Sequence, residues 1–190
     1  MLFKMGRQRA FEFRTWGGKR RSAGRPRLDG GKKAGVPHVQ RPALASRFPV
    51  HVTLRMQKRV WSLRSQRCFR ELERAFLKGS KDGFQIVHYS VMGNHIHLLV
   101  EAHDRRTLSL GMQGLGIRVA RSLNRVMHQA GRVLEDRYHS RILRTPTEVK
   151  RVRVYLLNNA RKHYGQTYLD LYSSQTALHE PRTFLLRQVC

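Results

Sequence analysis

Hydrophobic and polar residues alternate with two different periods along residues 48–165. Period-two runs rich in β-branched residues predict strands at 49–56, 83–92, 95–102 and 138–144. Apolar residues at helical spacing predict helices at 65–79, about 107–129 and 146–164. The order is therefore strand, helix, strand, strand, helix, strand and a final helix. This order predicts an α+β fold in which helices pack on an antiparallel sheet of ferredoxin-like type.

The segment VMGNHIHLLVE, residues 91–101, joins the second and third predicted strands. Only Gly93 and Asn94 separate the two apolar runs, and so short a link predicts a β-hairpin. Glycine at the first central position can adopt the positive φ of a type II′ turn. We therefore expect that turn type at Gly93.

The last predicted helix has a well-defined start. Thr145 is placed as the N-cap, Pro146 as the first helical residue, and Glu148 three residues after the cap. This is a capping box with a compatible proline. The helix should then continue through VKRVRVYLLNNARKHY to Tyr164.

The two ends of the chain lack this periodicity. Residues 1–46 mix Gly, Pro and basic residues, which cannot bury enough apolar surface to offset the entropy lost on ordering. We predict a disordered basic tail there, one domain at 47–166, and a C-terminal tail at 167–190 that is polar with a short apolar end.

The charge balance narrows the choice of partner. The chain carries 38 Lys and Arg against 12 Asp and Glu, a formal net charge of +26. Such an excess opposes compaction unless an anion neutralises it, which favours nucleic acid as the partner. An acidic membrane surface is the competing partner, but no apolar run approaches the roughly 18 residues of a spanning helix. We therefore expect no membrane association.

The N-terminal and cysteine patterns indicate a cytoplasmic protein. Residues 1–16 contain no uninterrupted apolar segment of the kind that a secretory signal needs. Cys68 and Cys190 have neither a metal-site spacing nor the even, dense pattern of a disulfide framework. A reducing compartment is the expectation.

His95 and His97 are the first candidates for chemistry. Residues two apart on a strand face the same side, so both imidazoles project together, with Leu99 further along the same face. They could hold one metal ion, or they could be half-exposed strand histidines. The sequence alone leaves both interpretations open.

Tyr155 and Asn159 share a face of the last predicted helix because they are four residues apart. Asn159 falls at the edge of the buried stripe that Val149, Val152 and Leu156 form, and Tyr155 lies slightly further toward solvent. A buried amide without a partner costs roughly 1–3 kcal/mol. Asn159 could therefore bond a backbone group, or complete a metal site that the histidines begin.

The long predicted helix carries Arg118, Arg121 and Arg125 beside its apolar stripe. They form either a solvated face or a track for a DNA backbone. The glycines of GMQGLG, residues 111–116, lack the following Lys and Ser or Thr of a phosphate-binding loop. We therefore expect no nucleotide cofactor.

These motifs together resemble the single-tyrosine HUH transposases. VMGNHIHLLVE resembles their His-hydrophobic-His strand, and YLLNNARKH, residues 155–163, resembles their tyrosine helix. Residues 122–143, SLNRVMHQAGRVLEDRYHSRIL, resemble the branch associated with bacterial repetitive extragenic palindromes (REPs). The similarity spans about residues 48–165.

The resemblance implies a function and a site. Tyr155 would attack single-stranded or hairpin DNA, form a covalent 5′-phosphotyrosine and free a 3′-hydroxyl. His95, His97 and Asn159 would hold Mg²⁺ or Mn²⁺, and Arg137 would join the three helix arginines in contacting DNA. The protein would act on the bacterial nucleoid as a monomer or homodimer.

The sequence is also compatible with another nucleophile and with two other functions. Tyr138 and Tyr164 are rival nucleophiles, although only Tyr155 has an amide four residues later. A non-catalytic nucleic-acid-binding protein could use the same sheet and basic tail. A metal-dependent nuclease with water as the nucleophile is the third possibility.

Overall fold

The computed structural model describes residues 39–165 and 170–189; the predicted N-terminal tail therefore lies outside the described residues except for 39–46. The elements are β1 (Val50–Arg55), α1 (Gln66–Leu77), β2 (Phe84–Val91), β3 (His95–Ala102), α2 (Arg105–Val126), β4 (His139–Ile142), α3 (Pro146–Tyr164) and α4 (Phe184–Arg187). The predicted order of strands and helices is confirmed, and the short α4 is an addition to it.

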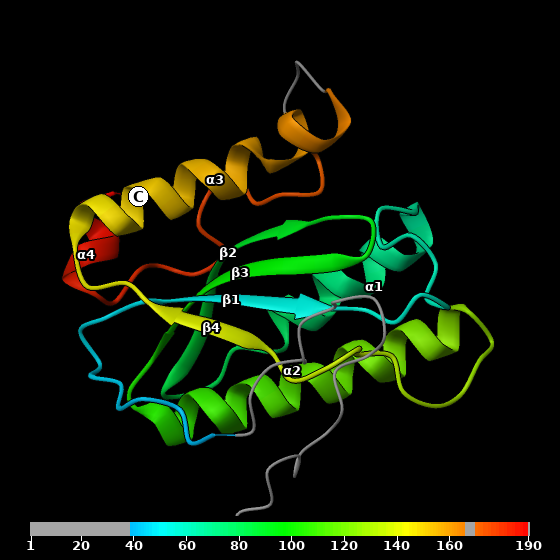
Figure 1. Cartoon of the computed structure of the whole chain (residues 1–190), viewed down its shortest axis with the longest axis horizontal. Coiled ribbons are helices and arrows are strands. Elements are labelled where there is room, and N and C mark those ends of the chain that lie inside the picture. The colour runs from blue at the N-terminus through cyan, green and yellow to red at the C-terminus, as the bar shows by residue number, and fades with distance from the viewer. Residues whose placement is uncertain (1–38, 166–169, 190) are drawn as a thin grey trace, which may run out of the picture. The chain divides into compact units, whose positions relative to one another are not determined.

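The four strands form one antiparallel sheet in the order β2-β3-β1-β4. Figure 1 shows this sheet between α3 on one side and α2, with α1 beside it, on the other. Along β3, Ile96, Leu98 and Val100 enter the larger core with α1 and α2. Leu99 enters the smaller core with α3. The predicted ferredoxin-like α+β fold is confirmed, and β3 contributes to both of its layers.

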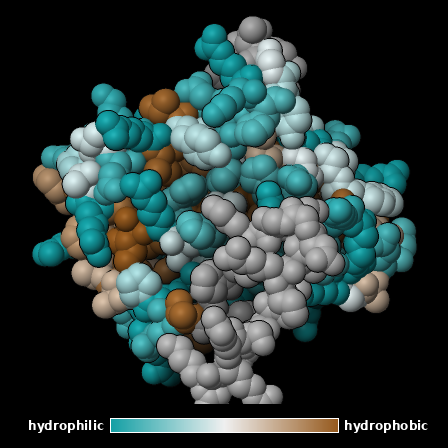
Figure 2. Space-filling model, in the orientation of Figure 1, coloured by the Kyte–Doolittle hydropathy of each residue, from teal (hydrophilic) through white to brown (hydrophobic). Residues whose placement is uncertain are grey.

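The surface agrees with the composition. In the view of Figure 2, hydrophilic side chains cover most of the coloured surface. None of the helices in the described part of the chain is both long and apolar enough to cross a bilayer.

Helix α3 begins and ends as its sequence dictates. The Thr145 side chain accepts a hydrogen bond from the Glu148 backbone N–H, and the Glu148 carboxylate accepts one from the Thr145 N–H, so the predicted capping box is present. Gly165 ends the helix with a φ of 65°, a left-handed conformation that glycine adopts at little cost. The helix therefore spans both proposed site residues without a break.

The turn between β2 and β3 is a hairpin, but the predicted type II′ geometry is wrong. Among the described glycines, positive φ occurs at Gly83, Gly131 and Gly165, and Gly93 is not one of them. The Gly93 N–H instead donates to the Tyr164 hydroxyl at 2.9 Å. A Cβ built at Gly93 would lie 3.2 Å from that oxygen. Close approach to the end of α3 therefore explains the glycine.

The C-terminal segment differs from the predicted tail, because residues 170–189 pack on the sheet. The Leu178 N–H donates to the Val87 carbonyl at 2.8 Å and the Ser174 N–H to the Tyr89 carbonyl at 3.0 Å, which lays the segment along the outer edge of β2. The buried Glu101 carboxylate accepts from the backbone N–H groups of Arg182 and Thr183. Backbone hydrogen bonds and buried charged side chains hold the segment on the sheet. Neither produces a hydrophobic periodicity in the sequence from which the segment could have been predicted.

A buried ion pair anchors the start of this segment. Arg64 donates to both carboxylate oxygens of Asp170, at 3.0 and 2.7 Å. The two side chains are only 10% and 3% exposed. Arg64 also lies over the Tyr172 ring, 4.2 Å from its centroid. Removing one partner would leave the other as an uncompensated buried charge.

We predict that Asp170→Asn lowers the free energy of unfolding by about 3 kcal/mol. The matched control is Glu71→Gln, which removes the carboxylate that pairs with the exposed Arg74 and should cost about 0.5 kcal/mol. Urea unfolding followed by circular dichroism measures both. Equal costs for the two variants would contradict the anchoring role.

Candidate active site

The site lies on the sheet face that α3 covers. On β3, His95 and His97 project to this face, and their ring centroids are 4.8 Å apart. The neighbouring strand β1 adds His51, whose ring stacks on that of His97 at 5.3 Å, and Thr53, which pairs directly opposite His97 in the register. The two predicted histidines therefore belong to a larger polar group.

Helix α3 brings Tyr155 to this group. The Tyr155 hydroxyl lies 3.2 Å from His97 Nε2, although the two residues are 58 positions apart in the chain. Their rings meet edge to face at 5.2 Å. Tyr155 is 38% exposed, so its phenol remains accessible from solvent. A hydroxyl thus lies beside the paired imidazoles, at the rim of the site.

Asn159 lies one helical turn further along α3 and is 1% exposed. Neither its Oδ1 nor its Nδ2 has a hydrogen-bond partner among the described residues. The backbone bond that sequence reasoning left open is therefore not formed. Buried amides are normally satisfied, so this side chain fits a position that awaits a ligand.

Burial keeps the imidazoles neutral. It lowers the pKa of His97 to about 3, and the charges of His95, His51 and His163 add to the effect. Burial likewise lowers the pKa of His51 to about 4, with help from His139 and Arg141 of β4. The pKa of His95 is lowered by burial and then by Arg55 and His163. Neutral imidazoles have a free lone pair and can bind a metal without first losing a proton.

These donors fit a divalent cation. His95 and His97 supply neutral nitrogens, and Asn159 supplies an amide oxygen without a partner. Among the described residues, no group of three or more His, Cys, Asp or Glu side chains is arranged to hold a metal. Mixed nitrogen and oxygen donors of this kind suit Mn²⁺ or Mg²⁺ better than a thiolate-seeking metal.

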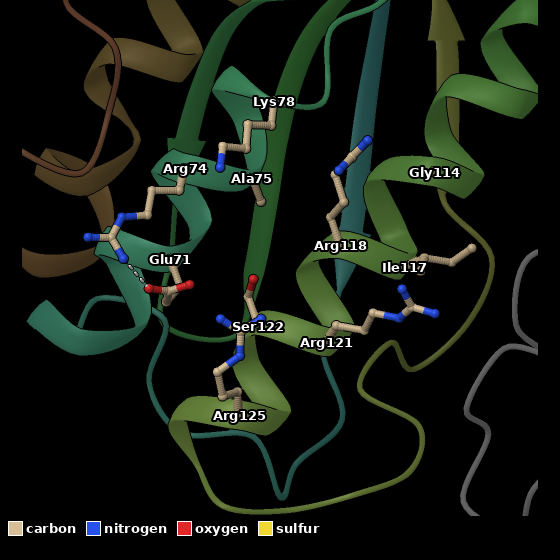
Figure 3. Close-up of a pocket in the computed structure, with 10 residues that line it drawn as sticks. All are labelled: Glu71, Arg74, Ala75, Lys78, Gly114, Ile117, Arg118, Arg121, Ser122 and Arg125. Carbon is tan, nitrogen blue, oxygen red and sulfur yellow. Dashed lines mark hydrogen bonds and ion pairs between the residues drawn. The ribbon is translucent and has the colours of Figure 1, made fainter.

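The predicted DNA-contacting arginines lie away from this site. Arg118, Arg121 and Arg125 line a groove of about 570 Å³ between α1 and α2, on the other side of the sheet. Figure 3 shows them on α2, opposite the helix α1 that carries Arg74 and ends next to Lys78; the Arg121 side chain extends away from α1. Arg137 lines a separate cavity of about 690 Å³ that includes Tyr138. The structure brings none of the four to Tyr155.

Sequence reasoning missed His51 and Thr53. Both lie in the run HVT of a strand that was correctly predicted, and their alternation already placed them on one face. Which face, and opposite which residue, depends on the pairing of β1 with β3. A single sequence does not contain that register.

In this chain a strand with paired histidines, in a ferredoxin-like sheet, faces a tyrosine on a helix, as the resemblance to the single-tyrosine HUH transposases implies. The family model described as Transposase IS200 like matches residues 45–159, more than half of the chain. The chain therefore belongs to the IS200-like transposase family, whose members act in DNA transposition.

Two solved structures are similar to this chain. One is described as the REP-associated tyrosine transposase bound to a REP hairpin; it is 15% identical, with a TM-score of 0.60 over 74% of this chain and 83% of that one. The other is a Deinococcus radiodurans R1 protein provisionally assigned as a transposase, 19% identical, with a TM-score of 0.43 over 65% of this chain and 95% of that one. No curated protein matches this chain.

The depressed histidine pKa values predict a loss of stability in acid. Because the folded-state pKa of His97 is about 3 against an ordinary 6.5, the unfolded chain binds more protons between these values. The contribution is complete above pH 6.5 and is lost as the pH falls toward 3. We expect the free energy of unfolding to drop by about 2 kcal/mol or more across this window.

Urea titrations at several pH values measure this dependence. His88, whose pKa burial lowers to about 4, contributes in the same direction. The His97→Gln variant should therefore show a shallower dependence that does not vanish. Parallel curves for the variant and the wild-type chain would contradict a buried neutral His97.

Proposed function

We propose that this transposase cleaves single-stranded or hairpin DNA with Tyr155 as the nucleophile and rejoins strands through a covalent 5′-phosphotyrosine. The observation that carries the proposal is the contact of the Tyr155 hydroxyl with His97 Nε2 at 3.2 Å. A phenol is poorly ionised at neutral pH, so a tyrosine nucleophile needs basic or cationic neighbours. Because burial keeps the imidazoles neutral, a divalent cation held beside them would have to supply that positive charge.

The proposed step is a transesterification, in which the Tyr155 oxygen replaces the DNA 3′-oxygen on the phosphorus. The Tyr155 oxygen forms a bond to the phosphorus, the bond from phosphorus to the 3′-oxygen breaks, and the phenolic proton ends on that oxygen as the free 3′-hydroxyl. The phosphodiester is conserved in the phosphotyrosine. Rejoining therefore needs only a 3′-hydroxyl as acceptor and no nucleotide cofactor.

His95, His97 and Asn159 would hold Mg²⁺ or Mn²⁺. When bound, the ion would neutralise charge on a non-bridging phosphate oxygen and polarise the phosphorus. His97 Nε2 has one lone pair, which can serve either the Tyr155 hydroxyl or a cation. The contact between Tyr155 and His97 therefore represents a resting arrangement, and the phenol must leave it when the ligand set is used.

The surroundings of the site favour a phosphate. Arg55 and His163 lie close enough to His95 to lower its pKa, and Arg141 does the same for His51. This positive environment attracts the DNA backbone. It supports DNA as the substrate, as in the REP-hairpin complex of the structural relative. The expected setting is the bacterial nucleoid.

The geometry also favours Tyr155 over the other candidate tyrosines. The Tyr164 hydroxyl accepts a hydrogen bond from the Gly93 backbone, and the Tyr164 ring faces the Arg64 guanidinium. Tyr138 contacts Arg41 and lines the cavity beside α2. Of the three tyrosines, Tyr155 is the one whose hydroxyl lies beside a site histidine. We therefore assign the nucleophile to Tyr155.

We predict that Tyr155→Phe abolishes the covalent adduct while single-stranded DNA binding stays within about twofold, because the variant differs only in the hydroxyl. End-labelled oligonucleotides with Mn²⁺, run on denaturing gels, measure the adduct. Tyr138→Phe is the matched control and should form it normally. Cleavage that survives Tyr155→Phe would instead indicate a water nucleophile, and binding without any cleavage by the wild-type chain would indicate a non-catalytic protein.

We further propose that the groove between α1 and α2 binds DNA phosphates away from the chemistry. Arg118, Arg121 and Arg125 form none of the ion pairs found among the described residues. Like charges spaced three and four residues apart on a helix repel one another. An anionic backbone along the groove would relieve that repulsion.

The lining of this groove suits a phosphate backbone better than bases. Within the described part of the chain, the lining residues include no aromatic side chain on which a base could stack. The groove would therefore bind phosphates without reading the sequence. Arg137 would extend this binding surface toward the neighbouring cavity.

We predict that Arg118→Gln with Arg121→Gln weakens DNA binding and lowers the slope of log affinity against log salt by about two, because each arginine would neutralise one phosphate. The matched control is Arg67→Gln with Arg70→Gln, which removes the same charge from exposed positions of α1 outside the groove. Fluorescence anisotropy at several salt concentrations measures the slopes. Equal slopes for both double variants would contradict a specific role of the groove, because any exposed arginine pair would then contribute equally to DNA binding.

A further inference from the structure

Both ring nitrogens of His97 face neighbours. On one side, Nδ1 lies 3.1 Å from Thr53 Oγ1 and 3.3 Å from His51 Nε2. On the other side, Nε2 faces the Tyr155 hydroxyl. His97 is 6% exposed, so these contacts are made away from bulk water. The ring therefore has a β1 side and an α3 side.

The pairing of the strands creates the β1 side. Thr53 is the direct cross-strand partner of His97, which places its hydroxyl next to the imidazole on the same face. His51, two residues earlier on the same face, stacks its ring on His97 with an interplanar angle of 28°. Thr53 therefore supplies a polar contact at a ring nitrogen, whereas His51 also covers the ring from one side.

The contact of Nδ1 with β1 determines whether Nε2, on the α3 side, carries a proton or a lone pair. A neutral imidazole has one protonated nitrogen and one with a lone pair. If Nδ1 carries the proton, it donates to Thr53 Oγ1, and the Nε2 lone pair faces the helix that carries Tyr155 and Asn159. If Nε2 carries the proton, that lone pair is lost to any cation. An acceptor for Nδ1–H therefore favours cation binding at Nε2, and Thr53 Oγ1 at 3.1 Å is nearer to Nδ1 than His51 Nε2 at 3.3 Å.

We propose that Thr53 is the positioning residue that fixes the tautomer of His97, and that stacking by His51 fixes the plane of its ring. Thr53 Oγ1 accepts from His97 Nδ1–H and so keeps the Nε2 lone pair available on the α3 side. The inference rests on the proposed function in one respect, namely that His97 would hold the divalent cation. Partners of this kind on metal-binding histidines set both ring orientation and basicity.

The test measures Mn²⁺ affinity of the full chain without DNA, by isothermal titration calorimetry. Thr53→Val keeps the shape of the side chain but removes the acceptor, and it should weaken Mn²⁺ binding about 10- to 100-fold. Thr53→Ser restores a hydroxyl and should recover most of that loss. His51→Phe keeps a stacking ring and should weaken binding less than Thr53→Val.

A second measurement reads the tautomer itself. Nitrogen-15 NMR of the metal-free wild-type chain should show His97 protonated at Nδ1, and Thr53→Val should produce a mixture of tautomers. A general packing defect would not exchange the two nitrogen signals, and Thr53→Ser would not correct it. His97 protonated at Nε2 in the wild-type chain, or Mn²⁺ affinity unchanged in Thr53→Val, would overturn the proposal.

These results separate the inference from the proposed function. If Thr53→Val loses Mn²⁺ affinity but the wild-type chain forms no covalent DNA adduct, the positioning role stands and the strand-transfer proposal fails. If the adduct forms through Tyr155 while Thr53→Val binds Mn²⁺ as tightly as the wild-type chain, the positioning role fails alone. A wild-type chain that does not bind Mn²⁺ would overturn the positioning role directly.

Discussion

The alternation of side chains along β3 is the constraint on which the rest of the molecule depends. One set of residues, Ile96, Leu98 and Val100, completes the larger core, and Leu99 on the opposite face completes the smaller core. Helix α3 packs on Leu99 through Val152 and Leu156. Because His97 lies two residues from Leu99 on that face, the same packing that stabilises α3 also brings its tyrosine to the histidine. Strand β3 therefore carries both core residues and the histidines of the candidate site.

The charged side chains are also divided between the interior and the surface. The chain has few carboxylates, and two of them are buried where the C-terminal segment meets the rest of the domain: Glu101 accepts from the Thr183 backbone, and Asp170 of the segment accepts from the Arg64 side chain. The positive charge is left largely uncompensated on the outside. Within the site, by contrast, burial keeps the imidazoles neutral. A positive surface around a neutral donor group weakens cation binding by charge repulsion, and a phosphodiester beside the cation would offset that repulsion.

Local patterns predicted most of the fold, because periodicity and capping act over a few residues. The start of α3 at Pro146 was predictable to the residue, since Thr145 and Glu148 determine it by direct hydrogen bonds. The sequence also placed Tyr155 and Asn159 on one helical face and His95 and His97 on one strand face. The contact of Tyr155 with His97 could be expected only through a resemblance to a family, because it depends on how α3 crosses the sheet.

What sequence reasoning missed depends on contacts between distant residues. The Gly93 backbone donates a hydrogen bond to the Tyr164 hydroxyl, 71 positions away, and the two-residue link itself does not reveal that contact. Residues 170–189 bind the sheet through backbone groups and buried charges, which leave no periodic signal. His51 and Thr53 gain their role from the β1–β3 register.

The hydrogen bond between Gly93 and Tyr164 has a further consequence when it is considered with the opposite end of the helix. There, Glu148 of the first turn pairs with Arg141 of β4 at 2.7 Å. Helix α3 is therefore attached to the sheet on both sides of Tyr155, to an edge strand and to the β2–β3 turn. A DNA end covalently linked to Tyr155 would remain above the histidines for as long as the bond lasts, with side-chain rotation as its main freedom. Under the proposed function, such a tether would favour rejoining over escape of the cut strand.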